Sequence, residues 1–396
     1  LRNVLIRELI NAKLTNVAAI ENRALPALVW MEDHGVLIDV NSWKNYADKL
    51  AIEVADIEKE LVNRTGKLLN WRSNQQVLRL LRERGHHIHN TDDDTLKPLA
   101  SFDDVIKLIL QHREVSKKYT AFGHAFLEFV SDDSRIHPDF DQLGAVSGRM
   151  TCRKPNLQQI PRDPLYRSFF TSPENRILIK ADYSQIELRI AAEITNDRRM
   201  LEAYRYGEDL HTLTAKLVLG KKEVTKSDRQ AAKALNFGLI YGMGVERLRS
   251  YAANSYNVQL TADEAVRFRN KFFDAYAGIR RWQRCQKQGS EEIRTLSGRR
   301  RLNVDKFQEK LNTPVQGTGA DGLKAALGLM WETRILRPSA VPILAVHDEI
   351  VVECDESDAE SVKNWVVECM IQGMKQFLHK VPVEVEAIIT KNWSGK

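Results

Sequence analysis

The chain has 396 residues, of which 43% are hydrophobic and 28% are charged, so general disorder is excluded and two or three substructures with cores of their own are possible. Its formal net charge of +6 fits a polyanionic partner, although a charge excess alone identifies none. No apolar run approaches the roughly 18 residues of a membrane span and no secretory leader is visible, so we expect no membrane partner and a cytoplasmic location.

The first third of the chain is predicted to be helical. Apolar residues recur at helical spacing in segments such as 43–61 and 105–130, and glycines separate these segments. The histidines of 85–89 lack the spacing of a metal site, so a loop is the preferred interpretation. The chain opens on Leu1 rather than on Met, which indicates a fragment whose N-terminal neighbour has been removed.

The remaining chain alternates strands and helices. Residues 135–164 are rich in Pro, Gly, Arg, Asn and Gln, which is typical of a surface loop that contacts a polar partner. The elements predicted after this loop are a buried strand at 177–181, a helix at 185–194, a long helical region at 196–290, a basic turn at 297–301, a helix at 321–335, a hairpin around 347, a helix at 358–378 and a strand at 381–389.

The cysteines show no C-x-x-C spacing. Because zinc sites and disulfide frameworks in short domains have recognisable spacings, buried free thiols are the better interpretation. This applies to Cys152, Cys285, Cys354 and Cys369.

Asp182 lies where the predicted strand gives way to a helix. Taken alone, an aspartate in this position is more often a helix cap than a metal ligand. A second acidic site lies in 341–352, where two apolar runs flank His347, Asp348 and Glu349 and predict a hairpin with carboxylates at its tip. If the two strands are neighbours, the carboxylates converge, and two Mg²⁺ ions roughly 3.5–4 Å apart would relieve their repulsion and serve phosphoryl displacement. Two unrelated surface acids remain an equal alternative.

A third group of residues favours the metal-site interpretation. Arg229, Lys233, Phe237 and Tyr241 recur every four residues and therefore share one face of a predicted helix over 227–242. The cations suit the phosphates of a triphosphate, and an aromatic ring can stack on a base. An ordinary amphipathic helix is the alternative, but the glycines of 238–244 indicate close backbone approach and a hinge.

Together these residues resemble the family A DNA polymerases, the family of bacterial DNA polymerase I, over nearly the whole chain. Residues 182–189 are similar to the family's motif A, 229–242 to motif B and 347–349 to motif C, and a chance match to all of them in order is negligible. The loop 147–161 is similar to the family's primer and template contact loop, and 297–301 to a basic turn in its fingers.

The resemblance implies an α+β fold, namely a right-hand polymerase fold with helical thumb and fingers and an antiparallel-sheet palm. The expected domains are an N-terminal connector at 1–27 that follows a missing upstream domain, a thumb with an adjoining palm segment at 28–132, the first part of the palm at 133–195, the fingers at 196–312 and the second part of the palm at 313–396.

The resemblance also assigns roles to single residues. Asp182, Asp348 and the carbonyl of Tyr183 are expected to hold two Mg²⁺ ions, for which Mn²⁺ can substitute, and Glu349 supports them. Lys233 is a candidate proton donor to the leaving pyrophosphate, and Glu187 would crowd a 2′-hydroxyl. The residues expected to bind dNTP are Arg229, Lys233, Phe237, Tyr241, His211, Glu187 and Gln185, and those expected to bind primer-template DNA are Arg149, Asn156, Gln158, Asn312, Gln316 and His347.

The chain departs from the family at one position: Gln308 stands where bacterial members often carry an arginine, which puts one primer-strand contact in doubt. No proofreading module is recognisable, so we expect no 3′ to 5′ exonuclease activity and a monomeric DNA-templated DNA polymerase. The alternatives are a single-subunit RNA polymerase, which Glu187 argues against, a non-catalytic DNA-binding relic, and a two-metal nuclease, which leaves the motif B face unexplained.

Overall fold

The computed structural model describes residues 2–395, and the chain divides into two compact units. The larger unit comprises residues up to 35, residues 138–161 and residues from 172 onward, and the smaller unit comprises 36–137 and 162–171. Within residues 2–395, none of the helices combines the length and the apolar composition that crossing a bilayer requires.

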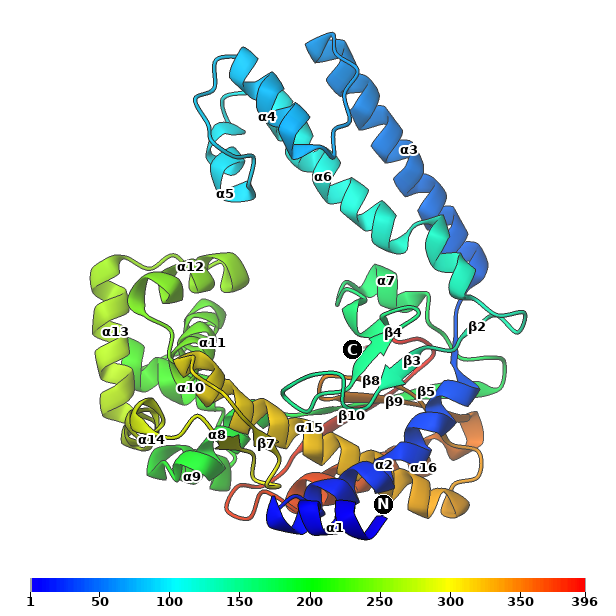
Figure 1. The fold of residues 1–396 in the computed structure, drawn as a ribbon, viewed down its shortest axis with the longest axis vertical. Coiled ribbons are helices and arrows are strands. Elements are labelled where there is room, and N and C mark those ends of the chain that lie inside the picture. Colours follow the sequence, from blue (N-terminus) through cyan, green and yellow to red (C-terminus); the bar gives the residue numbers. More distant parts are fainter. Residues whose placement is uncertain (1, 396) are drawn as a thin grey trace. The chain divides into compact units, whose positions relative to one another are not determined.

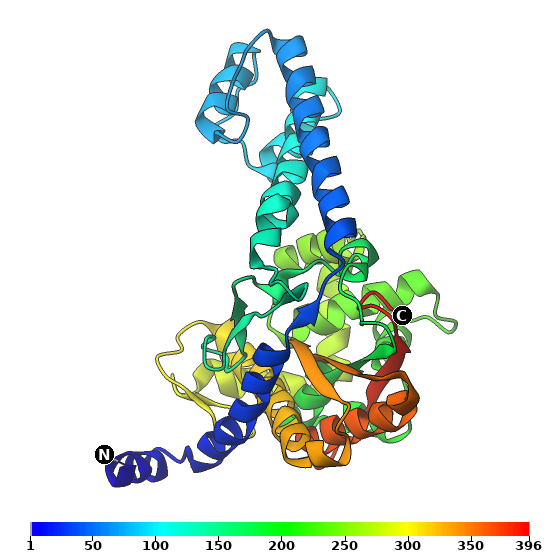
Figure 2. The same ribbon diagram turned by 90° about the vertical axis from the view of Figure 1, so that its right-hand side faces the viewer.

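The smaller unit is built on two long helices that lie side by side, α3 (Val40–Thr65) and α6 (Asp104–Phe122) (Figure 1, Figure 2). The side chains of Asp39 and Asp103 cap them by accepting hydrogen bonds from backbone N–H groups of the first turn. Helix α3 ends at Gly66, whose φ of 65° is a left-handed conformation that favours glycine. The helix predicted over 105–130 is shorter than expected: α6 ends at Phe122, and a 3₁₀ segment, η2 (His124–Phe129), follows it.

Short elements complete the smaller unit. They are α4 (Asn74–Glu83), α5 (Asp93–Leu96), η1 (Lys97–Leu99), α7 (Pro164–Ser168) and the pair β1 (Val36–Leu37) and β2 (Arg135–Ile136). The predicted loop at 85–89 is confirmed, and there His86 contacts Asp103 at 2.8 Å. The apolar side chains of α3, α4 and α6 form one core cluster that includes Leu61, Leu81 and Ile106.

A four-stranded antiparallel sheet forms the centre of the larger unit, in the order β10 (Val385–Thr390), β5 (Arg176–Tyr183), β9 (Glu349–Asp355) and β8 (Val341–Val346). The predicted strand at 177–181 and the predicted hairpin around 347 are thus confirmed. The last strand begins at 385 rather than at 381, because the N–H groups of Lys380 and Val381 donate to the carboxylate of Glu193 instead of to a neighbouring strand.

Helices α2 (Thr15–His34) and α16 (Ala359–Lys375) pack on the sheet, and α15 (Phe307–Thr333) packs against both of them (Figure 1). The helix predicted to begin at 321 begins at 307, although it contains Pro314. Close packing explains why the helix contains glycines. A Cβ on Gly317 would lie 2.8 Å from the carbonyl oxygen of Ser147, so a glycine is needed where another segment approaches the helix.

The long helical region predicted at 196–290 is a cluster of shorter helices. It consists of α9 (Arg198–Arg205), α10 (Leu210–Thr214), the π-helical η4 (Ala215–Leu219), α11 (Lys226–Ile240), α12 (Val245–Tyr256), α13 (Ala262–Ala275) and α14 (Ala277–Gln288). Helix α8 (Ile186–Thr195) connects the sheet to this cluster. Capping boxes at Thr225 with Asp228 and at Thr261 with Glu264 define where α11 and α13 begin.

Two expectations from the sequence are wrong in detail. The segment 135–164 is not one loop, because it contains β2, the antiparallel pair β3 (Asp139–Asp141) and β4 (Thr151–Arg153), and η3 (Leu157–Gln159). Of the four free cysteines, Cys285 is exposed, since it lies on the solvent side of the amphipathic helix α14. The remaining elements are α1 (Arg2–Asn11), β6 (Ile293–Arg294), β7 (Arg300–Arg301), η5 (Arg334–Leu336) and η6 (Glu356–Asp358).

Candidate active site

The predicted acidic residues Asp182 and Asp348 lie on neighbouring strands. Asp182 is near the end of β5 and is directly opposite Glu349, the first residue of β9, while the N–H of Tyr183 donates to the backbone oxygen of Asp348 at 3.3 Å. Asp182 is not the N-cap residue of α8, because Gln185 occupies that position, with φ of 51°. The convergence of the two acidic segments is therefore confirmed, and the helix-cap alternative is wrong.

The hairpin between β8 and β9 displays its polar residues at a tight turn. Val346 pairs with Glu349, so His347 and Asp348 alone form the connection, and His347 has a left-handed φ of 59°. His347 is exposed, Asp348 is partly buried and Glu349 is buried. The two apolar strands are buried along nearly their whole length, so they hold the turn rigidly at the edge of the core.

Glu349 has a partner that the sequence did not predict. The indole Nε1 of Trp393 donates to its Oε1 at 2.5 Å, and Trp393 is only 1% exposed. The Nζ of Lys180 on β5 donates to the carbonyl oxygen of Gly395, which fixes the same C-terminal segment beside the sheet. The sequence signal for this contact was a single tryptophan within an otherwise polar tail.

Glu187 joins three of the predicted segments. Its carboxylate on α8 accepts a hydrogen bond of 2.6 Å from the hydroxyl of Tyr241 and one of 2.9 Å from the guanidinium of Arg149. Burial raises the pKa of the Tyr241 hydroxyl well above its usual value, and the neighbouring charge of Glu187 raises it further, so the hydroxyl remains a donor. Tyr241 is the C-cap residue of α11, which places this contact at the end of that helix.

The other end of α11 contacts a carboxylate that was not among the residues predicted from the sequence. Asp209, the N-cap residue of α10, accepts from Nε of Arg229 at 3.1 Å and from an Nη of the same guanidinium at 2.8 Å. Gln185 also donates to it, at 3.2 Å. The signal for Asp209 in the sequence was its N-cap position two residues before His211.

His211 is buried beside α11. Burial lowers the pKa of its imidazole to about 4, with Arg229 and Lys233 lowering it and Asp209 opposing them. The side-chain amide nitrogen of Asn236 lies 2.8 Å from Nδ1, and because an amide nitrogen only donates, the neutral ring carries its proton on Nε2. The ring of Phe237 lies 5.9 Å from this imidazole, and Nζ of Lys233 lies 6.0 Å from the ring centroid of Tyr256 on α12.

The glycines at the end of α11 fulfil the expected close approach. A Cβ on Gly238 would lie 2.6 Å from a methyl group of Leu248, and one on Gly242, where φ is 72°, would lie 2.7 Å from the ring of Phe307. Helices α12 and α15 therefore pack directly against the backbone here.

Five of the six residues predicted to contact primer-template DNA lie in two groups, and the sixth is Asn156. Arg149, Gln158 and His347 line one small cavity together with residues of α15, and Gln158 donates to the carbonyl oxygen of Ala345 at 3.2 Å. Asn312 and Gln316 are one turn apart on α15, and the Oδ1 atom of Asn312 is buried without a hydrogen-bond partner in the part of the chain described. Asn156 caps η3 by accepting from the N–H of Gln158, so it also has a local structural role.

The basic turn at 297–301 is largely internal. Arg299 donates to Asp321 at 2.8 Å and contacts Glu21, and Nζ of the fully buried Lys324 donates to Glu21 at 2.7 Å. Burial lowers the pKa of Lys324, and the adjacent charge of Glu21 opposes that effect. These contacts anchor the β6–β7 turn to α2 and α15.

A family model described as DNA polymerase family A matches residues 40–395. The chain belongs to DNA polymerase family A. Among family A relatives, DNA polymerase I of Aquifex aeolicus (strain VF5) is 40% identical over 316 residues, covering 77% of this chain and 54% of that protein. The thermostable DNA polymerase I of Thermus filiformis is 33% identical over 397 residues, covering 92% of this chain and 46% of that protein. The chain thus spans about half the length of the curated relatives it matches.

The fold of this family A chain is also similar to a solved polymerase domain. The POL domain of Pol1 from M. smegmatis, in a complex with DNA primer-template and dNTP, matches with a TM-score of 0.87 and 27% identity, covering 99% of this chain and 73% of that chain. The predicted α+β right-hand polymerase fold, with helical thumb and fingers and an antiparallel-sheet palm, is confirmed.

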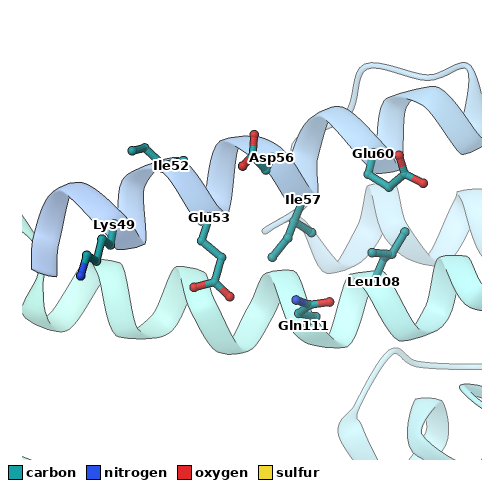
Figure 3. Close-up of a pocket in the computed structure, with 8 residues that line it drawn as sticks. All are labelled: Lys49, Ile52, Glu53, Asp56, Ile57, Glu60, Leu108 and Gln111. Carbon is teal, nitrogen blue, oxygen red and sulfur yellow. The ribbon is translucent and has the colours of Figure 1, made fainter. Parts of the chain in front are cut away.

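The smaller unit carries a groove without any of the predicted family A site residues. The groove, of about 420 Å³, lies between α3 and α6 and is lined by Lys49, Ile52, Glu53, Asp56, Ile57, Glu60, Leu108 and Gln111. Glu53 and Ile57 point from α3 toward α6, whereas Asp56 points away (Figure 3). Its lining is mainly acidic, which does not suit a nucleic-acid backbone.

Proposed function

We propose that this chain catalyses DNA-templated DNA synthesis, in which the 3′-hydroxyl of a primer attacks the α-phosphorus of a dNTP and pyrophosphate leaves. The observation that carries the proposal is the arrangement of Asp182 opposite Glu349, with Asp348 in the adjoining turn, in a chain of family A. Further support comes from the similar Pol1 domain of M. smegmatis, which was solved with DNA primer-template and dNTP.

Asp182, Asp348 and the carbonyl of Tyr183 would hold two Mg²⁺ ions, with Mn²⁺ as a substitute. Mg²⁺ prefers oxygen ligands and is usually bound by one or two carboxylates together with water and substrate phosphates. Within residues 2–395 no group of three or more His, Cys, Asp or Glu side chains could hold a metal, so the fit is to ions that arrive with the nucleotide rather than to a complete protein cage. Bound there, such ions would activate the attacking oxygen and stabilise the leaving one.

The nucleotide would lie along α11. Arg229, Lys233 and the Nε2 proton of His211 would bind the triphosphate, and Lys233 would also donate a proton to the leaving pyrophosphate. The dNTP site would further include Gln185, while Phe237 and Tyr241 would pack on the base. Glu187 would lie beneath the sugar, where its hydrogen bonds to Tyr241 and Arg149 would hold it against a 2′-hydroxyl.

Primer-template DNA would contact the six residues that the sequence assigns to it. Side chains that hydrogen-bond to base edges and to the DNA backbone position the two strands. In this chain these side chains would be the amides of Asn156, Gln158, Asn312 and Gln316, together with Arg149 and His347. The thumb, palm and fingers would have the boundaries expected from the sequence.

We further propose that this chain acts as a monomer and lacks 3′ to 5′ exonuclease activity. The segment 139–141 contains two acids, Asp139 and Asp141, but both lie in the small β3–β4 pair, and Asp139 accepts a hydrogen bond of 2.9 Å from Arg153 there.

A primer-extension gel tests the proposal. We expect purified protein to extend a labelled primer on a DNA template with dNTPs and Mg²⁺, to stop when EDTA is present, and to leave a mismatched primer unshortened. Equal extension with rNTPs would point to an RNA polymerase, shortening of the DNA would point to a nuclease, and DNA binding without extension would point to a catalytically inactive relic. Each of those results would contradict the proposed activity.

A further inference from the structure

The carboxylate of Asp209 collects hydrogen bonds from two residues proposed to bind the nucleotide. Arg229 approaches it with both Nε, at 3.1 Å, and one Nη, at 2.8 Å, so the guanidinium fork is directed at this single side chain. Gln185 approaches from α8 and donates to Oδ2 at 3.2 Å, while its own Oε1 is buried without a hydrogen-bond partner in residues 2–395. Donors from α8 and α11 thus converge on an anion supplied by α10.

Asp209 is held firmly in this position. Its Oδ1 accepts from the N–H of Thr212 at 2.8 Å and from the hydroxyl of the same residue at 2.7 Å, which is the N-cap geometry of α10. Partial burial raises the pKa of this carboxyl, but the hydrogen bonds from Arg229 and Thr212 outweigh it and keep the pKa well below the usual range. Asp209 is therefore ionised at neutral pH.

A guanidinium offers the same planar fork to a carboxylate and to a phosphate. An arginine whose fork is already directed at a carboxylate must release or share that partner before a phosphate group can bind in the same way. The nearby His211 is neutral at neutral pH because of its lowered pKa of about 4, so it does not compensate the charge of Asp209.

We propose that Asp209 is a positioning residue that occupies the phosphate-binding fork of Arg229 in the nucleotide-free protein and competes there with the triphosphate of the incoming nucleotide. The proposal rests on the proposed polymerase function and deepens it. The contact with Asp209 keeps Arg229 ordered on the face of α11. It also weakens nucleotide binding by the free energy needed to displace or share the carboxylate. Asp209 touches neither the substrate nor the metals in this role.

The variant D209N tests the competition, because an Asn side chain retains an oxygen that can cap α10 but loses the negative charge. We expect the KM for dNTP, and the Kd measured by single-turnover extension, to fall about two- to fivefold, as suits the loss of one partly exposed ion pair. The effect should fall on KM more than on kcat, and it should shrink at high salt. In an R229Q background the additional change D209N should have no effect on KM.

Glu208 provides a matched control, since it is exposed, adjacent in sequence and has the same charge. E208Q should leave the KM for dNTP as in the wild type. An equal fall in KM in D209N and E208Q would show that the general negative charge of this segment, and not the contact with Arg229, weakens nucleotide binding. D209S, which can cap the helix but is too short to reach Arg229, should reproduce D209N if the latter folds poorly. An unchanged or higher KM in folded D209N or D209S would overturn the proposal.

A second measurement separates this inference from the proposed function. Calorimetric titration of the DNA-free protein with inorganic tripolyphosphate needs no catalysis, and we expect D209N to bind it about two- to fivefold more tightly than the wild type. If the wild type fails to extend a primer, the proposed function fails, whereas the tripolyphosphate titration still decides whether Asp209 competes for Arg229. Equal tripolyphosphate affinity in wild type and D209N would overturn the competition even if the wild type extends primers normally.

Discussion

The indole Nε1 of Trp393 donates a hydrogen bond of 2.5 Å to Oε1 of Glu349, and both side chains are buried. The last strand and the tail after it therefore reach back to the β8–β9 hairpin that carries Asp348. A residue near the C-terminus thus orients a carboxylate at the candidate metal site, and this arrangement leads to a direct test.

Changing Trp393 to Phe keeps a buried ring but removes the donor to Glu349. Removing one partner of a buried hydrogen bond costs about 1–3 kcal/mol, so the carboxylate should lose one restraint on its orientation. We expect W393F to need a several-fold higher Mg²⁺ concentration for half-maximal primer extension. W365F is the control, because Trp365 also loses an indole hydrogen bond, of 2.9 Å to Thr333, away from the site. The same Mg²⁺ requirement in W393F and wild type would contradict the prediction.

Neutralising either strand-end carboxylate should abolish synthesis. D182N and D348N preserve side-chain size but remove the charge that would hold Mg²⁺, and we expect extension rates at least about a hundredfold lower, since metal stabilisation of a phosphoryl-transfer transition state is worth several kcal/mol. Primer-template affinity, measured by gel shift, should remain near the wild-type value. D355N removes a carboxylate from the far end of β9, where Asp355 accepts from Arg176 at 2.7 Å, and should extend normally. Active D182N or D348N would refute the metal assignment.

The hydroxyl of Tyr241 should contribute to sugar selection through Glu187. Y241F removes the 2.6 Å hydrogen bond but keeps the ring, so Glu187 retains Arg149 and loses one restraint. A typical hydrogen bond contributes about 0.5–1.5 kcal/mol, which corresponds to a two- to tenfold fall in the preference for dNTP over rNTP, measured as a ratio of kcat/KM.

Tyr204 is the matched control for this change. Its hydroxyl is buried and, within residues 2–395, has no hydrogen-bond partner, so Y204F should leave sugar preference unchanged. Unchanged selectivity in Y241F would show that Glu187 does not depend on the Tyr241 hydroxyl. An equal loss in Y204F would show that the effect is not specific to Tyr241.

His211 should make stability depend on pH in a defined window. Burial lowers its pKa from 6.5 to about 4 in the folded protein, so the unfolded chain binds a proton there that the folded chain does not. Stability is therefore full above about pH 6.5 and is lost as the pH falls toward 4, by up to roughly 3 kcal/mol. Asp209 acts only at lower pH, because its folded pKa is depressed below 3.8 and its contribution is lost as the pH falls below that value.

Urea unfolding at several pH values checks this expectation. Between pH 7 and pH 5 the midpoint of wild type should fall more steeply than that of H211N, which has no imidazole to protonate. Parallel pH dependence in the two proteins would show that the folded pKa of His211 is not depressed.

The sequence predicted most of the elements near the candidate site because their signals are local. The short apolar run before Asp182 and the two apolar runs around His347 are typical of buried strands, and the three strands formed as expected. Helix α15 was predicted too short, since local propensity penalises Pro314 and the glycines while tertiary packing tolerates them.

By itself, the sequence determined the family, the carboxylates of motifs A and C and the periodic face of α11, because each depends on residue identity at a short spacing. Only the tertiary structure decided which side chains meet across long separations: Trp393 with Glu349, Tyr241 with Glu187, and Asp209 with Arg229. Such pairs depend on strand register and on how helices pack, which no local pattern encodes. The sequence alone left the role of Asp182 ambiguous, and the pairing of β5 with β9 places it opposite Glu349 in the candidate site.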